Sequence, residues 1–272
     1  MILNNLALFA GAGKLPAIAV KNARQKGISP IVYHIAETTL DPTLKNDAML
    51  KVRSVSIGEM VKTFQFLQED KITHIVLLGK FEKQRLLQDV ERDATAERLY
   101  AAAPDRRDDT LFHEFARLVA QAGIQIYEQK LFLDGCFLPQ GVHTRLKPEL
   151  PTLLADIEFG YSLSQRVGEL DIGQTAIVYE KMILAVEAIE GTDAAISRAG
   201  AIVRKRGGVV CKSAKASQDA RFDLPAVGIR TLETMAESGM QALVIEAEQT
   251  LVIDPKEFIA KADALGLIVV AQ

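Results

Sequence analysis

Acidic residues gather in the stretch 170–196, "LDIGQTAIVYEKMILAVEAIEGTDAAI". Gln174 begins a β pattern there, and Glu187, Glu190, Thr192 and Asp193 follow the second β run around a glycine. Clustered carboxylates at a strand end suit a divalent cation that bridges phosphate oxygens. A helix cap at Thr192 or Asp193, and a solvated acidic loop, are the competing interpretations.

A second polar stretch, "CKSAKASQDARFDLPAVG" at 211–228, mixes cations with acids. Its charged and amide residues include Lys212, Lys215, Gln218, Asp219, Arg221 and Asp223. A loop that holds anion-binding cations and acids beside an apolar Leu-Pro pair is typical of a phosphoryl-transfer site. Alternating charges in a surface loop also form salt bridges of little energy, and the residues alone do not decide between the two interpretations.

Two glycine turns follow apolar runs in the first half of the chain. Gly11, Gly13 and Lys14 lie in "FAGAGKLP", and Gly79 and Lys80 lie in "LLGKFEK". Glycines at the carboxyl end of a parallel strand let backbone N–H groups approach a phosphate, and a helix N-terminus adds positive potential. An ordinary strand-to-helix turn is the alternative. Both the third glycine of the dinucleotide fingerprint and the GxxxxGKS/T phosphate loop are absent.

Several other catalytic patterns are missing from the sequence. The four histidines stand singly without metal-ligand spacing, no GxSxG elbow occurs, and Cys136 and Cys211 form no CxxC pair. These absences disfavour a His-rich binuclear metallophosphatase and covalent acyl chemistry. Two distant cysteines also suit a reducing compartment, so we expect a cytoplasmic protein.

The elements that must position these residues alternate in the first half of the chain. Apolar runs and helical patterns follow one another at 5–10, 15–26, 29–35, 59–69, 73–79, 91–103, 110–122 and 124–128. This order predicts βαβ units on a parallel sheet. We expect a Rossmann-like nucleotide-binding domain over residues 1–130.

The second half begins after a stretch rich in Gly and Pro at 131–150, which we interpret as a linker or crossover. Residues 152–168 then show helical spacing, and "TAIVYEKMILAVEA" predicts a β-hairpin around a charged turn. Helices and β runs alternate from there to the last residue. We therefore expect an α/β protein with a second, mixed α/β domain at 151–272 and an active site in the cleft between the domains.

Composition and charge restrict the partners. The chain has 272 residues, of which 49% are hydrophobic and 25% charged, and its net charge is −3. It can bury one large or two ordinary cores, and it has no global basic field for nucleic acid or for an anionic membrane surface. The sequence contains no 18-residue apolar run and no signal-peptide pattern at its start, so we expect neither a membrane span nor export.

The motifs together resemble a known family. "FAGAGKLP", "LLGKFEK", "RRDDT", "DIGQTAIV", "LAVEAIEGTDAAI" and "QDARFDLPAVG" stand in the order and spacing of the enzymes that hydrolyse UDP-2,3-diacylglucosamine in lipid A biosynthesis, the type unrelated to calcineurin-like phosphoesterases. The likeness covers essentially the whole chain, and "VEAIEGTDA" and "QDxRxDLPxxG" are specific to it. The chain departs from the pattern at "KFEKQRL", where many members have an Arg-Pro pair.

The resemblance implies a reaction. Magnesium-dependent cleavage of the pyrophosphate of UDP-2,3-diacylglucosamine would give 2,3-diacylglucosamine 1-phosphate (lipid X) and UMP, with water attacking the phosphorus on the sugar side. The resemblance also implies two α/β domains with the active site between them. Because the substrate carries acyl chains, we expect peripheral contact with the inner membrane through an apolar groove, and we expect a homodimer.

The resemblance also implies roles for individual residues. Asp223 of "RFDLP" would be catalytic, as a metal ligand or as the base that positions water, and Asp219 is the second catalytic candidate. The implied metal ligands are Asp223, Glu187, Glu190 and Asp193. The implied contacts to phosphate, sugar or nucleotide are Gly11, Gly13, Lys14, Gly79, Lys80, Gln174, Thr192, Lys212, Gln218 and Arg221. Asp108 and Asp109 of "RRDDT" match a family motif but equally suit a helix cap.

Two other functions compete with this hydrolase. A non-catalytic module that binds a nucleotide or an acyl-glycolipid accounts for the glycine turns but leaves the carboxylate clusters unexplained. A nicotinamide oxidoreductase fits poorly, because the third glycine is missing and no acidic residue clearly ends the second β run.

Overall fold

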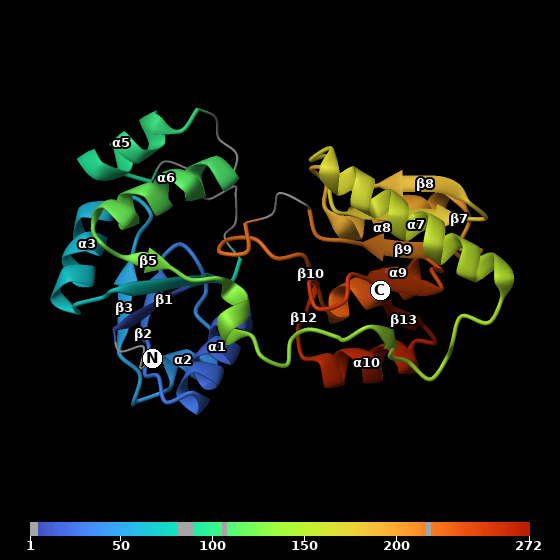
Figure 1. Cartoon of the computed structure of the whole chain (residues 1–272), viewed down its shortest axis with the longest axis horizontal. Helices are drawn as coiled ribbons and strands as arrows, with labels where there is room; N and C mark the ends of the chain where they lie inside the picture. The colour runs from blue at the N-terminus through green and yellow to red at the C-terminus, as the bar shows by residue number, and fades with distance from the viewer. Residues whose placement is uncertain (1–4, 81–89, 105–107, 216–218) are drawn as a thin grey trace. The chain divides into compact units, whose positions relative to one another are not determined.

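The computed structural model describes residues 5–80, 90–104, 108–215 and 219–272, apart from the side chains of residues 108 and 109. The chain divides into two compact units (Figure 1). The N-terminal unit comprises Met1–Asp134 together with Ala220–Phe222, and the C-terminal unit comprises Gly135–Asp219 and Asp223–Gln272. A three-residue segment from late in the sequence therefore belongs to the first unit.

The N-terminal unit is built on a parallel sheet. Its strands are β1 (Leu6–Ala10), β2 (Ile31–Ile35), β3 (Val52–Val55), β4 (His74–Leu78) and β5 (Gln125–Ile126). They lie in the order β3-β2-β1-β4-β5, and every pair is parallel. The predicted parallel sheet is confirmed. The sequence pattern missed β3, because this strand is short, half of its residues are exposed, and it has no apolar run.

Helices cover both faces of this sheet. They are α1 (Leu15–Gln25), α2 (Pro42–Lys45), α3 (Met60–Glu69), α5 (Ala94–Ala102), α6 (Asp108–Gln121) and the 3-10 helix η1 (Gln129–Phe132). Side chains of α3, α5 and α6 share one apolar core with Phe9, Tyr33 and Leu77 of the sheet. Figure 1 shows α1 on the opposite side of the sheet from α6. The chain thus places the turns after β1 and β4 at the carboxyl edge of an open parallel sheet, where α/β proteins bind ligands.

The C-terminal unit contains a six-stranded mixed sheet. Its strands are β6 (Gly141–Val142), β7 (Thr175–Tyr179), β8 (Met182–Val186), β9 (Val209–Lys212), β11 (Ala242–Ile245) and β13 (Ile268–Ala271). The order is β6-β13-β11-β9-β7-β8, with β9, β11 and β13 parallel to one another. A separate parallel pair joins β10 (Ala226–Val227) to β12 (Leu251–Val252). The predicted mixed α/β unit is confirmed.

The predicted hairpin at the edge of this sheet is also confirmed, since β7 and β8 pair antiparallel. Its turn residues Glu180 and Lys181 have φ values of 49° and 57°. The buried Asp156 carboxylate accepts hydrogen bonds from the N–H groups of both residues, at 2.7 Å each. This buried acceptor stabilises a left-handed turn that two non-glycine residues adopt reluctantly.

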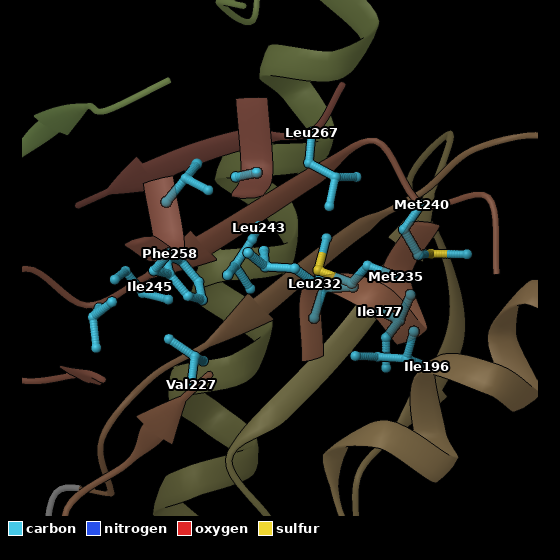
Figure 2. Packing of buried hydrophobic residues seen from close by; sticks show 14 of the residues in the cluster. Ile177, Ile196, Val227, Leu232, Met235, Met240, Leu243, Ile245, Phe258 and Leu267 are labelled. Carbon is cyan, nitrogen blue, oxygen red and sulfur yellow. The ribbon is translucent and has the colours of Figure 1, made fainter. Parts of the chain in front are cut away.

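The C-terminal sheet is covered on both faces. Its helices are α7 (Pro151–Glu169), α8 (Thr192–Ile202), α9 (Ile229–Glu237) and α10 (Pro255–Ala264). Leu153 and Ile157 of α7 pack with Val178 and Val244 on one face. On the other face, shown in Figure 2, α8, α9 and α10 contribute the residues Ile196, Leu232 and Phe258 to a larger core. In the described ranges, no helix is long and apolar enough to cross a membrane.

Candidate functional site

The two predicted glycine turns of the N-terminal unit lie against each other. Gly11 N–H donates to Leu78 O at 2.8 Å, and Ala12 and Lys80 exchange two backbone hydrogen bonds of 2.9 Å each. The turn after β1 is therefore joined to the turn after β4 by a short bridge. The structure brings together two segments that stand almost 70 residues apart in the sequence.

This close approach explains two of the glycines. A Cβ on Gly11 would lie 2.7 Å from Lys80 O, and a Cβ on Gly79 would lie 2.7 Å from the carbonyl carbon of Gly11. Gly79 also has a φ of +94°, a conformation that glycine adopts most easily. The Gly11 N–H bonds to Leu78 O and is therefore engaged in the fold, and the expected contact of Gly11 with substrate stays a prediction.

Gly13 differs from the other two glycines. Its φ is +100°, and a Cβ there would meet none of the described heavy atoms within 4 Å. Lys14 follows as the N-cap of α1, and Pro16 lies in the first helical turn. Gly13 and the start of α1 therefore leave room for the approach of an anionic ligand, and this role stays a prediction.

In the C-terminal unit, three predicted residues meet. Lys212 is the last residue of β9, Thr192 is the first residue of α8, and Glu187 follows β8. Lys212 Nζ donates to Thr192 Oγ1 at 2.7 Å, and the same hydroxyl donates to Glu187 Oε1 at 2.8 Å. Lys212 Nζ also lies 3.8 Å from Glu187 Oε2. Because Lys212 is only 6% exposed, its ammonium group is held in a largely dry setting.

Strand register adds Thr175, which sequence reasoning missed. Thr175 is fully buried and lies opposite Lys212 in the β7–β9 pairing, and its carbonyl accepts the N–H of Glu187 at 2.9 Å. Within the described part of the chain, the buried atoms Thr175 Oγ1 and Glu187 Oε2 have no hydrogen-bond partner. Buried oxygens without a partner are costly, so this cluster has unused hydrogen-bonding capacity. We name Thr175, Glu187, Thr192 and Lys212 the lysine cluster.

The other two predicted acids of this region face basic side chains. Glu190 Oε1 accepts from Arg198 at 2.5 Å, and its Oε2 accepts from the N–H of Ala188 at 3.1 Å. The backbone N–H of Glu190 and the Arg198 guanidinium hold the pKa of the Glu190 carboxyl below its usual range. Asp193 Oδ1 accepts from the Thr231 hydroxyl at 3.2 Å, and its Oδ2 lies 3.5 Å from Arg230 Nε.

This arrangement bears on the expected magnesium ion. Glu187, Glu190 and Asp193 pair with Lys212, Arg198 and Arg230 respectively. Among the residues that the structure describes, no group of three or more His, Cys, Asp or Glu side chains is arranged to hold a metal ion. The described acids therefore fit ion pairing rather than a shared magnesium site, and their assignment as metal ligands stays a prediction.

The segment that carries Asp219 and Asp223 forms one turn. The N–H of Asp223 donates to the carbonyl of Asp219 at 3.1 Å, and the Asp223 side chain is exposed. Arg221 places its guanidinium 4.8 Å from the centre of the Phe222 ring. The catalytic role of both aspartates stays a prediction.

The remaining predicted residues are less informative. The carbonyl of Gln174 accepts from the N–H of Ser213 at 3.1 Å, and its side chain is half-buried. Gln218 lies outside the described residues. Asp108 and Asp109 are the first two residues of α6, so "DDT" lies at the start of a helix. The expected position of the active site between the domains also stays a prediction.

Comparison with known proteins identifies the chain's relatives. Residues 5–136 match the family model of the LpxI N-terminal domain, and residues 139–270 match that of the LpxI C-terminal domain. The UDP-2,3-diacylglucosamine pyrophosphatase LpxI of Caulobacter vibrioides is 31% identical to this chain over 277 residues. The alignment covers 98% of this chain and 97% of that relative. The chain belongs to the LpxI family.

Membership of the LpxI family confirms the resemblance expected from the motifs, over nearly the full length of the chain. Both LpxI domain models match, one after the other, in agreement with the α/β organisation of two units. Among solved structures, a GalE-like L-threonine dehydrogenase from Cupriavidus necator aligns over 98% of this chain and 96% of its own, with 10% identity and a TM-score of 0.32. That likeness is too small to bear on the LpxI assignment.

Proposed function

We propose that this protein hydrolyses UDP-2,3-diacylglucosamine to 2,3-diacylglucosamine 1-phosphate and UMP. In this reaction a water oxygen bonds to the phosphorus on the sugar side, and the bond from that phosphorus to the bridging oxygen breaks. UMP leaves with the bridging oxygen. The observation that carries the proposal is the full-length similarity to a curated UDP-2,3-diacylglucosamine pyrophosphatase, 31% identical over 98% of this chain.

The lysine cluster supplies suitable chemistry for a diphosphate. The Lys212 ammonium is a point charge held by the Thr192 hydroxyl at the first turn of α8. A cation beside a helix N-terminus attracts phosphate oxygens, and burial strengthens the attraction because little water screens it. We place one phosphate of the substrate against Lys212, with the hydroxyl of Thr175 as an additional hydrogen-bonding group.

Asp223 is the proposed catalytic group, as the base that positions water or as a metal ligand, with Asp219 as the second candidate. The Asp223 side chain is exposed, in contrast to the largely buried Lys212. Gly13 and Lys14 at the start of α1, and Lys80 after β4, are the proposed contacts of the nucleotide half. Such use of the carboxyl edge of a parallel sheet would be Rossmann-like.

Magnesium dependence belongs to the proposal because the family resemblance implies it. No step of the reaction is assigned to the ion. We expect UMP release to stop when divalent cations are removed with a chelator and to return when magnesium is added in excess. Continued UMP release from chelated protein would remove magnesium from the proposal and leave the hydrolysis in place.

The location and the assembly of the protein are part of the same proposal. We propose that it acts in the cytoplasm at the surface of the inner membrane, as a homodimer and without nucleic acid. The exposed side chains Leu146, Leu150 and Leu154 precede and begin α7, and they offer apolar contact with lipid. Flotation with lipid vesicles tests the contact, and sedimentation equilibrium tests the dimer.

Incubation of the purified protein with UDP-2,3-diacylglucosamine and magnesium in ¹⁸O-labelled water tests the function directly. We expect UMP release, with the label in the phosphate of the sugar product. Label in UMP would show attack on the other phosphorus. Bound substrate without any UMP release would favour the alternative, a non-catalytic module that binds a nucleotide or glycolipid.

A further inference from the structure

Gln129 forms hydrogen bonds with two segments that lie far from it in the sequence. It is the first residue of η1 and is only 7% exposed. Its Nε2 donates to Leu77 O in β4 at 2.6 Å and to Phe222 O at 3.1 Å. Its backbone N–H donates to Ala220 O at 3.0 Å. Gln129 therefore makes two hydrogen bonds with a segment about 90 residues further along the chain.

The same segment is also packed by aromatic rings. Phe222 is 9% exposed and belongs to the apolar core of the N-terminal unit. Its ring stacks on Phe112 of α6 with the centroids 5.2 Å apart and lies edge-on to His113 at 5.8 Å. Packing and hydrogen bonds together explain why Ala220–Phe222 belongs to the N-terminal unit although its neighbours in sequence do not.

The contacts between Gln129 and Ala220–Phe222 lie next to a proposed catalytic residue. Phe222 immediately precedes Asp223, the proposed catalytic residue. Leu77, the other acceptor of Gln129 Nε2, stands two residues before Gly79 and three before Lys80. A single carboxamide thus fixes the backbone beside Asp223 to the strand that leads into the second glycine turn.

We propose that Gln129 is a positioning residue for Asp223. Its carboxamide holds the carbonyl of Phe222 in place and thereby limits the directions in which the Asp223 carboxylate can point. This inference rests on the proposed function, because it takes Asp223 as the catalytic group. A misplacement of about 1 Å in a catalytic group can cost about 10²-fold in rate, so a fixed backbone matters for turnover.

The chemistry of the side chain explains the choice of residue. A primary amide has two N–H donors on one nitrogen and can bond two carbonyl oxygens at once. Glutamate has no such donors when ionised, and methionine has nearly the same shape without any N–H. Gln129→Met therefore removes both donors while retaining most of the packing.

Asn22 offers a matched control in the same unit. It is 8% exposed in α1, and its Nδ2 likewise donates to two backbone carbonyls, Phe132 O at 3.0 Å and Asp134 O at 3.1 Å. Asn22→Leu likewise removes two side-chain hydrogen bonds to backbone carbonyls, one buried and one partly buried, without touching Ala220–Phe222. The two variants separate the loss of a buried amide from the loss of this particular anchor.

Steady-state UMP release and amide hydrogen exchange test the proposal. We expect Gln129→Met to lower kcat about 10²-fold with KM changed less than threefold. We expect Asn22→Leu to retain kcat within twofold. Exchange of the amides at residues 219–224 should speed up in Gln129→Met and stay unchanged in Asn22→Leu. Phe112→Leu is the second variant, for use if Gln129→Met fails to fold. It weakens the ring contact without leaving a buried carbonyl unpaired, and we expect it to lower kcat about tenfold.

Different results overturn the proposed function and the positioning role of Gln129. If the wild-type protein releases no UMP, the proposed function is overturned and the positioning role with it. If the wild type is active and Gln129→Met keeps the kcat of Asn22→Leu, only the positioning role is overturned. A rise in KM with unchanged kcat would assign Gln129 to substrate binding and would also contradict the proposal.

Discussion

The two units use the carboxyl ends of their strands in different ways. In the N-terminal unit, the turns after β1 and β4 are built from backbone, and Gly11 and Gly79 allow them to touch. In the C-terminal unit, the end of β9 carries a buried ammonium group that contacts the Thr192 hydroxyl and the Glu187 carboxylate. Backbone turns can hold a phosphate but cannot change charge during a reaction. Buried side-chain charges can stabilise a transition state.

From this difference we infer that the lysine cluster acts in turnover and that the paired glycines act in folding. Substitutions in the lysine cluster should affect turnover, whereas substitutions at the paired glycines should affect folding first. A third polar group, around Asp70 in the N-terminal unit, supplies a charged cluster with a purely structural task. The three regions can therefore be compared by substitution.

Among the three regions compared, the largest effect is expected at Lys212. Lys212→Met removes the cation proposed to bind phosphate and leaves the Glu187 carboxylate without its buried partner. We expect UMP release to fall about 10²-fold, as for the loss of one preorganised electrostatic group. We also expect a loss of about 3 kcal/mol in the free energy of unfolding, from breaking a buried ion pair. Steady-state kinetics and urea unfolding measure the two effects.

A double variant sharpens this prediction. Glu187→Gln combined with Lys212→Met removes both charges, so most of the lost stability should return. Activity should not return, because the phosphate still lacks its cation. Recovery of UMP release in the double variant would show that the Glu187–Lys212 pair is structural. It would contradict the inference that the lysine cluster acts in turnover.

The next largest effect is expected at Gly11. A methyl group there would lie 2.7 Å from the backbone oxygen of Lys80, which cannot move aside easily. We expect Gly11→Ala to lower the free energy of unfolding by about 2 kcal/mol, as for other overpacked sites. Gly228, which has open space around its Cβ position and an extended backbone, provides the control. Gly228→Ala should change stability by less than about 0.5 kcal/mol, and equal effects in the two variants would contradict the close-approach explanation.

The smallest effect concerns Asp70. Its carboxylate side chain is 2% exposed and accepts from Tyr33 Oη at 2.9 Å, from Lys51 Nζ at 2.5 Å and from Arg53. The Arg53 guanidinium in particular holds the pKa of the Asp70 carboxyl well below its usual range. A carboxyl with a lowered pKa in the folded state stabilises the protein above its unfolded pKa of about 3.9, and that stabilisation is lost as the pH falls.

We therefore expect Asp70→Asn to cost about 1.5 kcal/mol near pH 7, from hydrogen bonds to a charged group. The difference from the wild type should be constant between about pH 5 and pH 7 and should shrink below about pH 4. Urea unfolding at these pH values measures it. UMP release at pH 7 should be unchanged, and a marked loss of activity would place Asp70 in the functional machinery.

The sequence predicted most of the fold because the decisive signals are local. Apolar runs and helical spacing identified β1, β2 and β4 with their helices, and the charged turn at Glu180 and Lys181 identified the β7–β8 hairpin. β3 was missed because half of its residues are exposed and it shows no apolar run. The 3-10 helix η1 lies in the stretch where the Gly- and Pro-rich linker was expected to begin.

The candidate site was less predictable, because its geometry depends on contacts between distant residues. Sequence motifs named Glu187, Thr192 and Lys212, and the structure brings these three together. No local pattern distinguishes Thr175 from an ordinary strand threonine, and only strand register places it beside Lys212. Gln129 was missed for the same reason, since its acceptors lie 52 and 93 residues away. No local pattern showed that the Gly11 N–H bonds to Leu78 O, because its acceptor lies on a distant strand.

Asp223 is the proposed catalytic group in the hydrolysis of the pyrophosphate of UDP-2,3-diacylglucosamine. The most direct measurement compares UMP release and equilibrium substrate binding in the wild type and in Asp223→Ala. We predict that the wild type releases UMP and that the variant loses about 10³-fold in kcat with little change in Kd. Retained UMP release in Asp223→Ala, or an equal loss of binding and turnover, would contradict the account.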